Sequence, residues 1–307
     1  MQIISSDNTE KKIAILGNFD GVHLGHQRLF NEAIKRAKEK GYKTMIYTFY
    51  EYPAKVDNRI TTLSEKIDFF SELAIDYLYL DDFYEIKDLT PVEFLKNILI
   101  EKLNVVEIFC GFNYTFGINK SGTVDTLKEI IADELNNKIT VSVIDSVKDS
   151  EDKVISSTRI REYIMNTDLQ KAKELLGHNS IILGEVIHGK KIGRTLGFPT
   201  ANLKFENKVY PSYGAYGVYV HIFGDPNIYH GVMNIGTNPT LKPGELSVEV
   251  HILDFNKDIY GETIKIEILE KISDEIKFTT VEDLIEKINN DVKLWRKRID
   301  EKYGNTN

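Results

Sequence analysis

The stretch GNFDGVHLGH, residues 17–26, joins a short apolar run to an amphipathic segment. The run before it, IAIL at 13–16, predicts a buried strand, and the apolar spacing after it, through Ala33 and Ala37, predicts a helix. A helix N-terminus carries partial positive charge and free backbone N–H groups. This order of strand, loop and helix therefore predicts a phosphate-binding turn.

The glycines and histidines of this loop are its candidate binding groups. Gly17, Gly21 and Gly25 would let the backbone approach an anion closely. His23 and His26 would aim ring N–H groups at the same anion. The alternative is that two histidines near a helix start act only in capping or packing, because a glycine-rich turn alone is a weak signal.

The composition of the 307-residue chain is that of a soluble globular protein with one large or two ordinary domains. No apolar run approaches the ~20 residues of a membrane helix, and the first ten residues are too polar for a signal peptide, so we expect a cytoplasmic protein with no membrane partner. The net charge of −8 argues against a broad nucleic-acid surface. The single cysteine, Cys110, is expected to be a small buried side chain. Oligomeric state is not predicted.

Strand-like and helical runs alternate in the N-terminal half. This alternation is typical of an α/β fold with a parallel, doubly wound sheet. Such sheets bind ligands beyond the carboxyl ends of their strands, and the first strand-to-helix turn, here the histidine loop, is a usual place for phosphate. Strands are expected near 13–16, 43–49, 76–80, 105–110 and 139–144, and helices near 26–40, 63–74, 91–102 and 123–135.

The pattern changes after a helix expected over 158–176 and a linker at 177–180. Short alternating runs there predict a small antiparallel β-barrel, and a final amphipathic helix is expected over 281–298. We therefore predict two domains, a Rossmann-like domain over 1–180 and a barrel domain over 181–307. The barrel strands are expected at 181–187, 200–205, 216–223, 229–235, 247–253 and 262–269.

A second motif, ISSTRIR at 155–161, gathers three hydroxyls and two guanidiniums near the end of the predicted sheet domain. Hydroxyl donors at a helix start, with arginines one turn inside, make an anion site suited to the β- and γ-phosphates of ATP. Taken alone, such residues are more often helix caps and a solvated cationic face. The candidates are Ser156, Ser157, Thr158, Arg159 and Arg161.

A third segment, GFNYTFG at 111–117, follows the strand expected at 105–110. Asn113 is its candidate polar contact, and its aromatic side chains would wall a pocket. A plain loop whose aromatic residues fill the core is the competing interpretation.

The stretch GEVIHGKKIGRTLGFPTANL, residues 184–203, is the most specific part of the C-terminal half. Its glycines and cations would form a positively charged loop for a triphosphate, and no Walker A sequence is present. Thr200 and Asn202 would point neutral oxygens the same way from one strand, which suits Mg²⁺. The candidates are Gly189, Lys190, Gly193, Arg194, Gly197, Pro199, Thr200 and Asn202.

These stretches resemble one enzyme family over nearly the whole chain. Residues 17–26 match the G-x-F-D-G-x-H-x-G-H form of the H-x-G-H nucleotidylyltransferase signature, as in bacterial FAD synthetases, and 155–161 resembles the closing motif of that module. Residues 184–203 resemble riboflavin kinase. The chain is therefore similar to the bacterial bifunctional riboflavin kinase/FAD synthetases. Further similar segments are 111–117, 211–219, 234–240 and 249–255.

The resemblance implies two ATP-dependent reactions on small-molecule substrates. The C-terminal barrel would phosphorylate riboflavin with MgATP to give FMN, and the N-terminal domain would join FMN to AMP from a second ATP, releasing pyrophosphate and forming FAD. Residues that the motifs assign to nucleotide or flavin binding are Gly17, Asn18, Phe19, Asp20, Gly21, Asn113 and Asn234.

The resemblance also implies catalytic roles. Glu249 would accept the proton of the riboflavin 5′-hydroxyl, although a strand glutamate facing solvent is the alternative interpretation. His23 and His26 would stabilise charge on the phosphate oxygens. Arg159 and Arg161 would hold the leaving pyrophosphate.

Two departures from the family pattern stand out. Residues 48–53 read TFYEYP where many relatives carry TFDPHP, so Tyr50 and Tyr52 replace an acid and a histidine, and Ser273 stands where relatives often place an arginine. Two other hypotheses follow, namely that only the kinase half is active or that the protein is a catalytically silent flavin sensor. The presence of His26 and Glu249 argues against a sensor, which needs a pocket but not the reacting groups.

Overall fold

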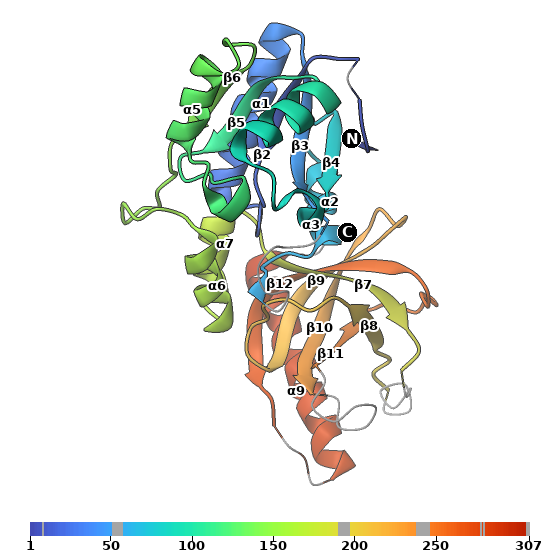
Figure 1. Ribbon diagram of the computed structural model, residues 1–307. Helices are drawn as coiled ribbons and strands as arrows, with labels where there is room; N and C mark the ends of the chain where they lie inside the picture. The colour runs from blue at the N-terminus through green and yellow to red at the C-terminus, as the bar shows by residue number, and fades with distance from the viewer. Residues whose placement is uncertain are drawn as a thin grey trace. The chain divides into compact units, whose positions relative to one another are not determined.

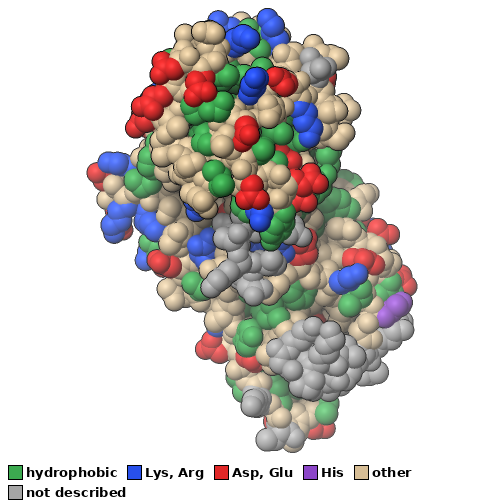
Figure 2. All heavy atoms as spheres, viewed as in Figure 1, with side chains coloured by type: hydrophobic (Ala, Val, Ile, Leu, Met, Phe, Trp, Pro, Cys, Tyr) green, Lys and Arg blue, Asp and Glu red, His purple; other side chains and the backbone are tan. Residues whose placement is uncertain are grey.

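The computed structural model describes residues 1–7, 9–50, 58–189, 197–237, 246–276, 278 and 280–304. The chain divides into two compact units, Met1–Arg159 and Ile160–Asn307 (Figure 1). The predicted parallel sheet and antiparallel barrel are both confirmed. Within the described ranges, no helix has the length and apolar character that crossing a membrane requires. Acidic and basic side chains are interspersed on the face drawn in Figure 2.

The first unit is built on a six-stranded parallel sheet in the order β1-β4-β3-β2-β5-β6. From β2 the chain moves outward through β3 and β4, and it then returns to the other side of β2 with β5. A sheet of this kind binds ligands at the carboxyl ends of the strands where the order reverses, here β2 and β5. The strands are β1(Gln2–Ile4), which the sequence analysis missed, and β2(Lys12–Leu16), β3(Lys43–Phe49), β4(Tyr77–Asp81), β5(Val105–Gly111) and β6(Thr140–Ile144).

Helices cover both faces of this sheet. Helices α1(Leu24–Lys40) and α2(Leu63–Ser71) pack on the face that carries Ile13 and Ile15. The wide, π-type helix η2(Phe94–Lys102) and α5(Val124–Asp133) pack on the opposite face, against Ala14 and Leu16. Because successive strand side chains point to opposite faces, β2 is apolar at all four of these positions. Short helical turns are α3(Phe83–Ile86), α4(Pro91–Glu93) and η3(Ile118–Lys120).

The single helix expected over 158–176 is wrong, because the chain forms α6(Ser157–Met165) and α7(Leu169–Leu176) instead. Thr167 between them adopts a φ of +62°, which no helix allows. The carboxylate of Asp168 then caps α7 by accepting the N–H of Lys171 at 3.4 Å. Apolar residues recur at helical spacing on both sides of the break, so periodicity alone does not reveal it.

The second unit is a closed barrel of antiparallel strands in the order β10-β11-β8-β7-β12-β9. Residues such as Val218, Met233 and Val250 fill its interior. Helix α9(Val281–Arg298) and η4(Ile299–Tyr303) follow, and Trp295 is fully buried against a second apolar cluster outside the barrel core. The strands are β7(Ser180–Ile187), β8(Ala201–Phe205), β9(Gly214–Ile222), β10(Ile228–Thr237), β11(Leu246–Ile252) and β12(Thr263–Asp274).

Candidate active sites

A cavity of about 890 Å³ lies at the carboxyl ends of the parallel strands in the first unit. The loop after β2, the loop after β5 and the start of α6 all line it, so the tertiary structure joins three segments that are far apart in the sequence. This is where a doubly wound sheet is expected to bind a ligand. The predicted site residues that line the cavity are Gly17, Asn18, Phe19, Asp20, His23, His26, Asn113, Ser156, Ser157 and Thr158, while Gly21 lies within the same loop.

The two histidines of the first motif lie ring against ring. Their centroids are 3.6 Å apart, and His23 caps α1 by accepting the N–H of His26 on Nδ1 at 3.4 Å. Because Nδ1 of His23 accepts this hydrogen bond, the ring proton of His23 belongs on Nε2, and Nε2 can donate a hydrogen bond to a ligand. Burial lowers the pKa of His26 well below its ordinary value, and the nearby His23 and Lys66 lower that pKa further. His26 is therefore a neutral imidazole at neutral pH.

Two buried polar atoms at this loop lack a partner among the described residues, namely Nδ1 of His26 and Oδ1 of Asn18. Both residues line the cavity. Buried polar atoms are rarely left without a hydrogen bond in a folded protein. The two atoms therefore indicate that a polar ligand completes the site.

The loop itself is held by contacts behind the cavity. Oδ1 of Asp20 accepts the N–H groups of Ile60 at 2.7 Å and Thr61 at 3.1 Å. The main-chain carbonyl of Asp20 accepts the hydroxyl of Ser157 at 2.9 Å, which links the first motif directly to the second. The hydrogen bonds of Asp20 therefore fix the shape of the loop.

Lys66 is a further residue at this loop that sequence reasoning missed. Its Nζ donates to the carbonyl of Asn18 at 3.1 Å, and burial lowers its pKa to about 8. Lys66 and Phe70 are both buried and lie one turn apart on α2. A lysine on the apolar face of an expected helix was the available signal.

Aromatic side chains form much of the remaining cavity wall. Tyr114 and Phe116, predicted from the third segment, stack at 5.7 Å. Tyr47 and Phe49 at the end of β3 and Phe83 from α3 also line the cavity, and the sequence analysis missed these three. Tyr47 and Phe49 lie at the carboxyl end of β3, the strand next to β2, and that position was the available signal for these two residues. Phe83 follows β4, which is not adjacent to β2.

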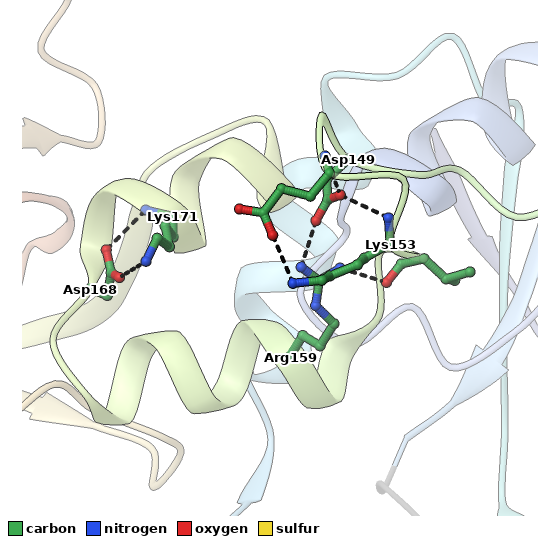
Figure 3. Close-up of polar contacts among 7 residues, drawn as sticks. Asp149, Lys153, Arg159, Asp168 and Lys171 are labelled. Atoms are coloured by element: carbon green, nitrogen blue, oxygen red, sulfur yellow. Dashed lines mark hydrogen bonds and ion pairs between the residues drawn. The ribbon is translucent and has the colours of Figure 1, made fainter.

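The two arginines of the second motif differ in their placement. Arg159 Nη2 lies 2.5 Å from Oδ2 of Asp149, and its Nη1 donates to the Val154 carbonyl at 2.8 Å (Figure 3). Among the described residues, the cavity wall includes Ser156 to Thr158 but not Arg159. Arg161 lies further along α6, in the part of that helix that belongs to the second compact unit.

In the second unit, three predicted residues align across neighbouring strands. Glu249 of β11 pairs in register with Asn202 of β8 and with Asn234 of β10. The flanking residues Val248 and Val250 point into the barrel core, so Glu249 and its two partners face outward. Residues far apart in the sequence thus form one polar row.

Thr200 and Gly189 lie beside this polar row. The hydroxyl of Thr200 donates to Oε2 of Glu249 at 3.3 Å. Burial raises the pKa of Glu249 above its ordinary value, and the hydrogen bond from Thr200 opposes that rise. A Cβ on Gly189 would lie 2.4 Å from Nδ2 of Asn202, so a larger residue at this position would have to displace the amide.

The remaining predicted residues of this half fall into two groups. Pro199 accepts a hydrogen bond from Nδ1 of His251 on its carbonyl at 2.9 Å, and Gly197 has a φ of +88°, a left-handed value that favours glycine. Lys190, Gly193 and Arg194 lie outside the described residues, as does Tyr52 of the altered TFYEYP segment.

The oxygen donors at this site fit a magnesium ion. Mg²⁺ prefers hard oxygen ligands and usually takes only one or two from the protein, together with phosphate oxygens and water. Thr200 supplies a hydroxyl and Asn202 an amide carbonyl, and the carboxylate of Glu249 lies beside them. In the parts of the chain that the structure describes, no group of three His, Cys, Asp or Glu side chains could hold a metal.

The departure at Ser273 has a structural role. Its hydroxyl hydrogen-bonds to Oδ2 of Asp291 at 3.1 Å and accepts a hydrogen bond from Lys287. Lys287 and Asp291 form an ion pair of 2.5 Å on α9. This position therefore joins β12 to the terminal helix.

Comparisons with known proteins cover both halves. A family model for FAD synthetase matches residues 5–159, and one for riboflavin kinase matches residues 176–299. The protein named bifunctional riboflavin kinase/FMN adenylyltransferase from Bacillus subtilis is 39% identical over 293 residues, which cover 92% of this chain and 90% of that protein. Its counterpart from Listeria monocytogenes is 37% identical over 290 residues, 91% and 90% of the two chains. A solved structure named macrolide-efflux protein, from Streptococcus pneumoniae, is 34% identical with a TM-score of 0.79, covering 96% of this chain and 98% of that one.

Proposed function

The chain belongs to the bifunctional riboflavin kinase/FMN adenylyltransferase family, and on this premise we propose how its two halves divide the two reactions. We assign FMN adenylyltransferase activity to residues 1–180 and riboflavin kinase activity to residues 181–307. The protein is an enzyme that converts riboflavin to FMN and FMN to FAD, with ATP as co-substrate in each step. We propose that it works in the cytoplasm, where ATP is available as the co-substrate of both steps. The observation that carries the first assignment is the cavity that joins the three N-terminal segments.

In the N-terminal half, a phosphate oxygen of FMN attacks the α-phosphorus of ATP, and the bond from that phosphorus to pyrophosphate breaks. His23 and His26 act as neutral N–H donors to the phosphate oxygens, where negative charge is greatest. The N-termini of α1 and α6 add their partial positive charge on the same cavity. The stacked pair needs no protonated ring, because the donors are preorganised.

The aromatic wall of the same cavity is proposed to hold the flavin ring. Phe49, Phe83 and Tyr114 offer flat apolar surface, and an isoalloxazine ring gains from stacking on such surface. Asn113 lies among them as the polar contact. The polar and aromatic parts of the lining would thus separate the phosphates from the ring.

In the C-terminal half, the 5′-hydroxyl of riboflavin attacks the γ-phosphorus of ATP, and the bond to ADP breaks. Glu249 accepts the hydroxyl proton, and its raised pKa makes the carboxylate a stronger base than an exposed glutamate. Thr200 orients that carboxylate through its hydrogen bond. Phosphoryl transfer needs this positioning more than covalent help.

Thr200 and Asn202 are the residues that would hold Mg²⁺, as their oxygen donors fit the ion. When bound, Mg²⁺ would neutralise charge on the phosphate oxygens of ATP. The cations expected at 190–194 would serve the same triphosphate.

A chromatographic time course of the purified protein with riboflavin, ATP and Mg²⁺ tests the proposal. FMN should appear first and then pass to FAD. FMN that accumulates without FAD would mean that only the kinase half works, which the altered Tyr50 and Tyr52 positions would explain. The absence of both products would contradict the enzyme assignment and favour a flavin sensor.

A further inference from the structure

One wall of the N-terminal cavity is a hairpin, residues 145–155, that approaches the start of α6. Residues 145–147 of its first arm and Val154 and Ile155 of its second arm line the cavity. The Val147 carbonyl accepts the N–H of Ile155 at 2.9 Å, and Lys148 and Val154 form a β-bridge. The tip of the hairpin, residues 148–153, is not part of the described lining. Its contacts therefore act on the cavity indirectly, through the two arms and through the start of α6.

Asp149 organises this tip. Its Oδ1 accepts the N–H groups of Glu151 at 2.9 Å and Lys153 at 3.0 Å, and its own N–H donates to the Lys153 carbonyl at 2.9 Å (Figure 3). Two further ion pairs of the tip, Lys148–Asp152 and Lys153–Glu151, have side chains that are 49% to 84% exposed. Ion pairs as exposed as these contribute little to the stability of the folded protein.

Arg159 connects the organised tip to α6. It lies in the first turn of that helix, directly after Ser156, Ser157 and Thr158. One guanidinium nitrogen contacts Asp149 at 2.5 Å and the other donates to the Val154 carbonyl at 2.8 Å, so a single side chain holds the tip and the second arm together. The side chains of Arg159 and Asp149 are only 22% and 13% exposed. A planar guanidinium serves both partners at once, which a lysine ammonium does less well.

We infer that Arg159 and Asp149 are positioning residues for adenylyl transfer. Their ion pair fixes the hairpin against the start of α6, so that the hydroxyls and N–H groups of Ser156 to Thr158 stay at the cavity where the ATP phosphates bind. Arg159 acts through Asp149 and not by touching the phosphates. The inference rests on the proposed function of the N-terminal half.

A double-mutant cycle on the full-length enzyme tests this inference. Asp149→Asn, Arg159→Gln and the double variant are compared in FAD formation from supplied FMN, with ATP concentration varied. Each single change should raise KM for ATP about 10-fold while kcat changes less, because misplaced binding groups weaken ground-state and transition-state binding together. The double variant should be no worse than either single one, since both changes break the same link.

Matched variants separate positioning from simple destabilisation. Lys153→Gln removes an exposed ion pair of the same tip and should leave KM for ATP unchanged. Arg159→Lys keeps the charge but loses the planar fork and should fall between the wild type and Arg159→Gln. Riboflavin kinase activity, measured in the same preparations, should be unchanged in all of them.

Two results would overturn the inference. One is a normal KM for ATP in Asp149→Asn. The other is a loss in Arg159→Gln that far exceeds the loss in Asp149→Asn and adds to it, which would mean that Arg159 contacts the phosphates itself. Neither result contradicts the proposed function of the N-terminal half. That function fails only if the wild-type protein forms no FAD from FMN and ATP.

Discussion

The imidazole rings of His23 and His26 stack with their centroids 3.6 Å apart and their planes 17° from parallel. Two protonated rings at this separation would repel each other strongly. Burial lowers the pKa of His26 most, and the neighbouring His23 lowers it further, so His26 stays neutral. The pair therefore offers the cavity hydrogen-bond donors without a permanent charge.

His26→Ala should stop FAD formation and leave FMN formation intact. Removal of a preorganised donor to a charged transition state costs about 100-fold or more in kcat. The measurement is FAD formed from supplied FMN, beside FMN formed from riboflavin in the same preparation. His178→Ala, which removes a histidine of the segment that connects α7 to β7, is the control and should change neither rate. An unchanged FAD rate in His26→Ala would remove this histidine from the mechanism.

The depressed pKa of His26 should make the protein less stable in mild acid. Below about pH 6.5, the ordinary histidine pKa, the unfolded chain binds a proton at this position that the folded protein does not. The free energy of unfolding should therefore fall as pH drops below 6.5, by up to about 1.4 kcal/mol per pH unit from this group.

Urea unfolding of the wild type and of His26→Asn between pH 7.5 and 5.5 measures this effect. The asparagine variant does not titrate and should lose less stability over the same interval. His230, whose pKa burial also lowers, is present in both proteins and cancels in the difference. Equal slopes for the two proteins would contradict the assignment.

Glu249→Gln should abolish FMN formation and spare FAD formation from supplied FMN. The amide keeps the size of the side chain but cannot accept the proton of the riboflavin hydroxyl. Loss of a general base lowers the rate by roughly 10²- to 10⁴-fold. Glu185→Gln, an exposed glutamate on β7 of the same barrel, is the matched control. Loss of both activities in Glu249→Gln would refute a model with two separate sites.

The kinase rate should fall on the acid side at a pH above the ordinary glutamate value of 4.5, because burial raises the pKa of Glu249. The base must be ionised, so kcat/KM drops as the pH falls through that raised pKa. Thr200→Val removes the hydrogen bond that opposes the rise and should move this acid limb to higher pH, whereas Thr200→Ser should leave it in place. Because Thr200 is also a proposed Mg²⁺ ligand, both variants are compared at saturating Mg²⁺. A pH–rate profile of riboflavin phosphorylation gives the answer, and an unshifted limb in the valine variant would count against the hydrogen bond.

Gly217→Ala should destabilise the barrel. A Cβ at this position would lie 2.3 Å from the ring of Trp295, which is fully buried. Overpacking of this kind costs about 1–3 kcal/mol. The loss of stability is measured by heating the protein and monitoring unfolding through its kinase activity. Trp295→Leu in the Gly217→Ala background should recover part of that stability. A Gly217→Ala protein of wild-type stability would show that α9 is free to move away.

Much of the fold was evident from periodicity. All five predicted sheet strands are confirmed to within one residue at each end, because β2, β3 and their neighbours are continuous apolar runs bounded by turns. The break between α6 and α7 and the short strand β1 were missed. Each depends on one or two residues, such as Thr167 at positive φ, that hardly disturb an average over a window.

The candidate sites divide in the same way. The motif at 17–26 predicted the histidines and their helix start, since cap and loop chemistry is local. The contact of Lys66 with Asn18 and the Asp20 contacts with Ile60 and Thr61 were not predictable, because they join residues about 40 or more positions apart. Phe83 likewise reaches the cavity only through the strand order of the sheet.

The sequence by itself determined which chemical groups this protein carries, because those choices depend on residue type and on spacing within one loop or strand. The tertiary structure alone decided which groups meet. Register across β8, β11 and β10 aligned Asn202, Glu249 and Asn234, and the tip of one hairpin placed Asp149 against Arg159. Such pairings follow from how strands and helices pack in three dimensions, and packing is a property of the whole chain that no local window contains.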